Sequence, residues 1–228
     1  MIKVYYFSGS GKSRRLAEYF GKKLDSPVLD ITKLSPDDYF SETAVVIFPV
    51  YCQNLPDAVF DFLPKLKAEK VVFAATYGRK SYGNVIMDAS EITNAKIIAG
   101  VCVPCGHSFL DEPDDFDFDA FEPIFERIKN PESAVISKAK KVFYADLVPA
   151  RRTQIGVKLF RNQNCNHCGK CIENCPTGAM EENSIGKNCI RCLRCVNECS
   201  QKALDFKTLQ FMRIYLCRNR KNELKFYL

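Results

Sequence analysis

The sequence predicts an α/β protein: a five-stranded, doubly wound parallel sheet followed by a small cysteine-rich α+β domain. Two observations support this prediction. Over the first two thirds of the 228 residues, short apolar runs alternate with segments of helical periodicity, as in a parallel sheet covered by helices on both faces. In the last third, eight of the 12 cysteines lie between Cys165 and Cys199, in two copies of one spacing.

The first predicted strand, residues 2–7, is a short run of apolar, β-branched and aromatic residues. It leads into Ser8-Gly9-Ser10-Gly11-Lys12-Ser13, and the next residues have a helical apolar face formed by Leu16, Ala17, Phe20 and Leu24. A strand, a loop of small and hydroxyl residues and a helix N-terminus form an anion site, because helix amides and the positive end of the helix dipole face the anion. We therefore predict that this loop binds a phosphate.

Two alternatives to the phosphate site concern the same loop. Gly11-Lys12-Ser13 matches the end of the P-loop motif of nucleotide hydrolases, but that motif requires glycine where this sequence has Tyr6. A tight turn without a ligand is the second alternative, and the sequence leaves it open.

Four more strands are predicted, at residues 28–31, 43–50, 70–76 and 95–103. Pro56 is expected to open a helix with an apolar face formed by Val59, Phe60, Leu63 and Leu66. Another helix is expected after Gly83, and the acidic residues 111–119 read as a solvated loop and helix start. A last helix is predicted from Asn130 as the cap, with Pro131 in its first turn, burying Val135, Ala139, Val142 and Phe143.

Ligands of doubly wound sheets bind at the carboxyl ends of the strands, so the loops after the first, third and fourth strands form the candidate site. Ser8, Ser10, Gly11 and Ser13 fit the S/T-x-S/T-G-x-S/T phosphate loop of flavodoxins, and residues 1–147 resemble that family. The resemblance implies FMN as the cofactor. Its phosphate would bind Ser8–Ser13, with Lys12 in a supporting role, and Tyr51 or Tyr77 would stack on the isoalloxazine ring. The residues expected to enclose that ring are Pro49, Val50, Tyr51, Cys52, Gln53, Asn54, Thr76, Tyr77, Gly78, Tyr82 and Gly83.

The cysteine pattern is the more specific signal. One run reads Cys165-x2-Cys168-x2-Cys171-x3-Cys175-Pro176, and a second run repeats that spacing further along the chain as Cys189-x2-Cys192-x2-Cys195-x3-Cys199-Ser200. Such runs are typical of two [4Fe–4S] clusters in which the fourth cysteine of each run serves the other cluster. We therefore assign Cys165, Cys168, Cys171 and Cys199 to cluster 1, and Cys175, Cys189, Cys192 and Cys195 to cluster 2. Structural zinc needs fewer cysteines per run, and a disulfide framework needs an oxidising compartment for which no signal peptide argues.

Residues 161–207 resemble a bacterial-type two-cluster ferredoxin, and Ala179 and Ala203 repeat at the same offset as the cysteines. Ser200, where the family usually has proline, departs from the pattern without removing a ligand. Residues 148–160 are expected to be a linker and 208–228 a tail. In the tail, Leu209, Met212, Tyr215 and Leu216 predict a packing helix, and the charged residues 218–221 a solvated turn.

Charge and hydropathy limit the possible partners. No apolar run approaches the roughly 18 residues of a membrane helix, so we expect a soluble, cytoplasmic protein without a membrane span. Residues 1–150 have a net charge of −3 and residues 151–228 a net charge of +9. Two oxidised clusters with their thiolates each add about −2, which reduces the basic excess and weakens a nucleic-acid interpretation.

The whole chain resembles a flavodoxin–ferredoxin fusion, a group of redox proteins found largely in anaerobic microbes. The resemblance implies an FMN-dependent oxidoreductase that passes electrons between FMN and two clusters, and on to a redox partner protein or a small-molecule donor or acceptor. A simple electron carrier with no substrate of its own is the alternative. A zinc-stabilised nucleic-acid binder is a third and weaker interpretation. No G-x-G-x-x-G motif occurs, so the sequence gives no argument for a bound nicotinamide donor.

Overall fold

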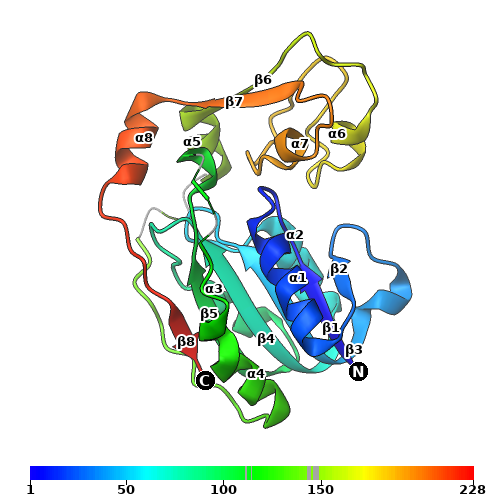
Figure 1. The fold of residues 1–228 in the computed structure, drawn as a ribbon, viewed down its shortest axis with the longest axis vertical. Coiled ribbons are helices and arrows are strands. Elements are labelled where there is room, and N and C mark those ends of the chain that lie inside the picture. Colours follow the sequence, from blue (N-terminus) through cyan, green and yellow to red (C-terminus); the bar gives the residue numbers. More distant parts are fainter. Residues whose placement is uncertain (111, 114, 143–144, 146–148) are drawn as a thin grey trace.

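The computed structural model describes residues 1–110, 112–113, 115–142, 145 and 149–228. Its larger part is a six-stranded sheet with the strand order β2-β1-β3-β4-β5-β8 (Figure 1). The first five strands are parallel in the order 2-1-3-4-5, which is the order of flavodoxin-like sheets. The strands are β1 (Ile2–Tyr6), β2 (Val28–Asp30), β3 (Phe40–Pro49), β4 (Lys67–Tyr77), β5 (Lys96–Pro104) and β8 (Lys225–Tyr227).

Helices cover both faces of this sheet because neighbouring residues of each strand point to opposite sides. On one face, Val4, Val45 and Val72 pack against α1 (Lys12–Leu24) and α4 (Glu122–Lys129). On the other face, the next residue along each strand packs against α2 (Asp57–Phe62) and α3 (Val85–Ile92). Short 3-10 helices lie at Pro36–Tyr39, Leu63–Lys65, Ser108–Leu110 and Asp119–Phe121. The prediction of a doubly wound parallel sheet is therefore confirmed.

Two predictions within this domain are wrong. Phe60 is 55% exposed, because the short helix α2 gives way to a 3-10 turn that presents Val59 and Leu63 to the core instead. The helix predicted from Asn130 does not form either: α4 ends at Lys129, and residues 131–142 have no regular secondary structure.

The segment at 131–142 is extended because its backbone amides are bonded to distant elements rather than to each other. Ala134 donates to the Ile97 carbonyl oxygen (2.9 Å), and Ala139 donates to the side chain of Asn84 (2.6 Å). Its apolar residues are not buried as predicted, since Val135 is 78% exposed. Phe143, also expected in this helix, lies outside the described residues.

The tail also differs from the prediction. Helix α8 (Gln210–Cys217) forms as expected, but Leu216 is its only buried residue. The chain then returns to the large domain, where β8 pairs antiparallel with β5 and adds the sixth strand. The charged residues 218–221, predicted to be a solvated turn, are bonded to the loop after β5, because Arg220 forms a two-pronged ion pair with Glu112 (2.6 and 2.7 Å).

The small domain lies over the carboxyl ends of the sheet strands, at the top of Figure 1. Its two-stranded antiparallel sheet pairs β6 (Val157–Arg161) with β7 (Leu204–Thr208). Its helices are α5 (Pro149–Gly156), α6 (Lys170–Glu173) and α7 (Arg194–Asn197). Strand β6 begins within the range expected to be a linker, so at least residues 157–160 belong to this sheet.

Among the described residues, no helix is both long enough and apolar enough to cross a membrane.

Candidate functional site

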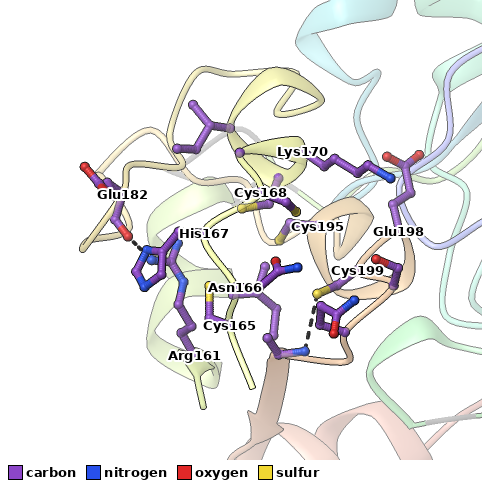
Figure 2. A pocket seen from close by; sticks show the side chains of 17 residues that line it. Arg161, Cys165, Asn166, His167, Cys168, Lys170, Glu182, Cys195, Glu198 and Cys199 are labelled. Carbon is purple, nitrogen blue, oxygen red and sulfur yellow. Dashed lines mark hydrogen bonds between the residues drawn. The ribbon is translucent and has the colours of Figure 1, made fainter. Parts of the chain in front are cut away.

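The four cysteines assigned to cluster 1 line one cavity of about 150 Å³. Cys165, Cys168 and Cys171 come from the first run and Cys199 from the second, and Cys195 also reaches this cavity (Figure 2). Left-handed backbone at His167 (φ 56°) and Gly169 (φ 77°) turns the chain tightly between the first three cysteines. Within the described chain, no three His, Cys, Asp or Glu side chains converge as they would around a single metal ion.

The cysteines assigned to cluster 2 are also brought together, and more deeply. Cys192 interacts electrostatically with Cys189 and Cys175, and Cys195 interacts with all three and also with Cys171 of the first run. Burial is the main reason that the pKa of Cys192 is raised to about 11 and that of Cys195 to about 12, and the neighbouring thiols act in the same direction. Thiolates crowded in such a place need a cationic centre beside them, because burial alone favours the neutral thiol.

The fourth cysteine of each run is held in the same way. The Cys175 sulfur accepts a hydrogen bond from the Ala179 amide (3.2 Å), and the Cys199 sulfur accepts one from the Ala203 amide (3.3 Å). Burial raises the pKa of each thiol, but these and other backbone amides lower it by more, so the net pKa is lowered. Amides directed at sulfur are among the features that tune iron–sulfur centres, so the donor set fits two clusters. The ligand assignments themselves stay predictions.

The Ser8–Ser13 loop has the geometry of an anion site. Gly11 caps α1 with φ 90°, no side chain caps the helix, and its first turn holds no acidic residue. The Gly11 amide donates to the Ser8 hydroxyl (3.1 Å), and the buried hydroxyls of Ser13 and Thr76 are 2.8 Å apart. No atom lies within 4 Å of the position that a Gly11 Cβ would take. This end of the site fits the phosphate of FMN.

Lys12 makes one contact across the site. Its ammonium group donates to the Glu112 carbonyl oxygen (2.8 Å), which ties the start of α1 to the loop after β5. The supporting role predicted for Lys12 stays a prediction.

The loop after β3 is a tight turn. Pro49 ends β3, Val50 donates to the Thr76 carbonyl oxygen (2.8 Å), and Tyr51 and Asn54 exchange backbone hydrogen bonds (3.1 and 2.9 Å). Cys52 (φ 52°) and Gln53 (φ 69°) are the left-handed central residues. The segment after α4 crosses this loop, with the Val142 amide bonded to the Gln53 side chain (3.2 Å) and Asn54 bonded to the Ala145 carbonyl oxygen (3.0 Å).

The two tyrosines expected near a flavin have different surroundings. Tyr77 is 1% exposed, and its hydroxyl donates to the Glu223 carbonyl oxygen (2.7 Å) and accepts from the Glu223 amide (3.1 Å). Tyr82 packs edge-on against it. Tyr51 instead lies edge-on to Phe7, and burial raises its pKa, with the Cys192 thiol adding to the shift. Tyr51 therefore lies beside the second cysteine loop, whereas Tyr77 is hydrogen-bonded to the tail.

The remaining predicted residues pack the loops together. The Cys52 sulfur lies 3.6 Å from the Thr153 hydroxyl of α5. Gly78 lies against the His107 ring, and Gly83 (φ 60°) lies against the backbone of Gln53, so each contact leaves no space for a side chain. These contacts hold the loops after β3 and β4 against each other.

Sequence reasoning missed one buried residue at this site. Arg194, between two predicted cluster ligands, is only 2% exposed and reaches into the large domain. Its guanidinium group donates to the Ser8 carbonyl oxygen (2.9 Å) and to the Thr32 hydroxyl (2.9 Å). The sequence offers one signal for it when the two cysteine runs are compared position by position. Beside Arg194 the second run has the apolar residues Ile190 and Leu193 where the first run has Asn166 and Gly169.

Comparison with known proteins agrees with this description. A family described as "4Fe-4S binding domain" matches residues 159–180, which include the first cysteine run. The chain combines a flavodoxin-like domain with a 4Fe-4S binding domain. A search of curated proteins found no match.

Three solved flavodoxins illustrate the structural likeness. One from Streptococcus pneumonia TIGR4 is 16% identical over 57% of this chain and 99% of its own, with a TM-score of 0.44. A short-chain flavodoxin associated with a PDU bacterial microcompartment is 19% identical over 57% and 97%, with a TM-score of 0.43. One from the Archaea is 16% identical over 42% and 76%, with a TM-score of 0.33. The strand order, rather than these scores, carries the fold assignment.

Proposed function

We propose that the protein transfers electrons between FMN, held at the carboxyl end of the large sheet, and two [4Fe–4S] clusters in the small domain. One observation carries this proposal: the second cysteine loop lies directly against the Ser8–Ser13 loop. A Cβ added at Gly9 would lie 2.7 Å from the Cβ of Cys192, and closer still to its carbonyl oxygen. Flavin accepts one or two electrons and each cluster accepts one, so this contact would join a two-electron carrier to one-electron carriers.

The chain's own residues have distinct parts in this function. The Ser8–Ser13 amides and hydroxyls would bind the phosphate, and the eight cysteines would bind the clusters. Burial of Cys189 and Leu193 (7% and 3% exposed) keeps water away from the second cysteine loop. The first loop is more open, because Cys168 is exposed. Electrons would therefore leave or enter the small domain at its first loop.

A simple electron carrier without its own substrate is the second candidate. The observation in its favour is that residues 131–142 and the tail are bonded to the loops expected around the flavin ring, through Gln53 and Tyr77. Steady-state turnover with quinones or other small oxidants separates the two candidates. Rapid turnover supports an enzyme, and electron exchange with protein partners alone supports a carrier.

Protein prepared without oxygen is expected to contain about eight iron atoms and about eight acid-labile sulfides per chain, the content of two cubane clusters. Colorimetric iron and sulfide assays measure this directly, and paramagnetic resonance of the reduced protein identifies the cluster type. Two zinc ions per chain with no sulfide would contradict the cluster assignment.

Ser10→Asp is expected to abolish FMN binding while both clusters remain. The added carboxylate would face the phosphate dianion inside an anion site, so attraction would become repulsion. Flavin content is measured from the absorbance of protein reconstituted with excess FMN. Ser10→Asn is the matched control, because it has nearly the same shape without the charge, and it should retain most of the flavin. Full occupancy in Ser10→Asp would place the phosphate elsewhere.

A further inference from the structure

The two cysteine loops have the same cysteine spacing, but they differ in how far their side chains are buried. When the two runs are aligned on their cysteines, the first loop has polar or small residues at three positions where the second has apolar or buried ones. Residues 166 and 170 are exposed, whereas Arg194 is 2% exposed and the side chain of Ile190 packs against the apolar core of the large domain. The corresponding pairs are Asn166 and Ile190, Gly169 and Leu193, and Lys170 and Arg194. Of the two loops, the second is therefore the one whose side chains pack against the large domain.

Arg194 makes polar contacts between that loop and the large domain. Its Nε donates to the carbonyl oxygen of Ser8 and its Nη1 to the hydroxyl of Thr32 (2.9 Å each). Its Nη2 lies 3.3 Å from the Asp30 carboxylate, as an ion pair rather than an aligned hydrogen bond. The guanidinium plane also lies over the Phe7 ring, 5.3 Å from its centroid. Every one of these partners belongs to the large domain, at the carboxyl ends of β1 and β2.

These contacts fix the position of the Arg194 side chain as well as stabilise the contact between the two domains. A guanidinium group has five donors in a rigid plane, so three contacts in different directions determine where it lies. A buried charge without partners is strongly unfavourable, so Arg194 is stable in this place only while the two domains are in contact. The second loop cannot approach further, because the Cys192 backbone already touches Gly9.

We infer, building on the proposed function, that Arg194 is the positioning residue that docks the second cysteine loop onto the Ser8–Ser13 loop, so that cluster 2 alone exchanges electrons with the flavin. In this arrangement one electron from the reduced flavin would reduce cluster 2, and its transfer to cluster 1 would return cluster 2 to its oxidised state. An external one-electron acceptor would take the electron from cluster 1 at the exposed first loop. A low-potential donor would drive the same transfers in the reverse order.

The first test compares Arg194→Gln with Lys170→Gln. Both variants remove one positive charge at the same position of the repeated motif, but only Arg194 is buried against the large domain. Hydrogen exchange measured by mass spectrometry reports docking without any need for flavin. Arg194→Gln is expected to speed exchange in both residues 8–13 and 189–195, whereas Lys170→Gln should leave residues 8–13 unchanged. Arg194→Lys, which retains the charge but has fewer directed donors, should fall between wild type and Arg194→Gln.

A second variant tests the same contact from the opposite side. Gly9→Ala introduces a methyl group that overlaps the Cys192 carbonyl oxygen, so it is expected to speed exchange in residues 189–195 with Arg194 intact. Gly186→Ala is the control, because its nearest neighbour would be at an ordinary 3.4 Å. Unchanged exchange in both Arg194→Gln and Gly9→Ala would overturn the docking role.

Electron transfer tests the order of the centres. After flash reduction of the flavin, Arg194→Gln should lose most of the fast flavin-to-cluster phase, whereas Lys170→Gln should retain it. Paramagnetic resonance at that time should show cluster 2 reduced before cluster 1. Reduction of cluster 1 first, or equal loss of the fast phase in both variants, would overturn the inference. Absence of flavin and clusters from the purified protein would refute the proposed function instead. The hydrogen-exchange measurements would still decide whether Arg194 docks the second loop.

Discussion

Cys175→Ala is expected to damage cluster 2 and leave cluster 1 intact, although Cys175 lies in the first cysteine run. Cys175 lies close enough to Cys192 and Cys195 to interact with both electrostatically, and Cys165, Cys168 and Cys171 line one cavity with Cys199 and Cys195. The crossed assignment itself is carried by the spacing of the two runs. Removal of Cys175 would leave a site with three thiolates, which tends to retain a degraded cluster. Paramagnetic resonance of the reduced protein is therefore more informative than iron content.

Cys199→Ala is the reciprocal control for this prediction. It should damage the cluster of Cys165, Cys168 and Cys171 and spare that of the second run. Together the two variants distinguish crossed ligation from local ligation, because local ligation would exchange the two results. If Cys175→Ala perturbs only the cluster of its own run, the crossed assignment is wrong.

The fold could be predicted from the sequence wherever the signal was local. A run such as Val45–Phe48 has to be buried on both faces, and the Ser8–Ser13 loop has to join a strand to a helix. The cysteine spacing is equally local, because three thiolates at regular short intervals curve around one centre. These predictions required no knowledge of distant partners, and the structure confirms the sheet. The assignment of the fourth cysteine of each run to the opposite cluster is not local and stays a prediction.

The predictions that depended on distant partners were the ones that went wrong. Residues 131–142 have helical apolar spacing, but their amides are bonded to Ile97, Asn84 and Gln53, and no periodicity contains that information. The charged residues 218–221 were expected to form a solvated turn, but Arg220 is paired with Glu112, which lies about a hundred residues earlier in the chain. Arg194 was missed because its polar partners all lie near the start of the chain, at the other end of the sequence.

The tail supplies one strand of the large sheet, so residues 1–147 alone do not contain the whole of that sheet. Deleting the segment 218–228 is therefore expected to unfold the large domain or leave it only marginally stable. The deletion removes β8 from the sheet edge together with the 5%-exposed Tyr227, and it leaves the buried Tyr77 hydroxyl without its partner at Glu223. Loss of a buried aromatic side chain costs about 3–5 kcal/mol, and an unpaired buried hydroxyl costs about 1–3 kcal/mol more. Domains of this size have a free energy of unfolding of about 5–15 kcal/mol, so this loss is a large fraction of the total.

Tyr227→Ala isolates the packing contribution in the full-length chain. Urea unfolding followed by circular dichroism should show a free energy of unfolding lower by about 3 kcal/mol or more. Tyr215→Ala is the matched control, because that ring is 50% exposed and lies under the ammonium group of Lys80. Its loss should cost about 1 kcal/mol or less, as expected for an exposed cation–π pair. Equal, small effects of the two substitutions would show that β8 contributes little to the stability of the sheet.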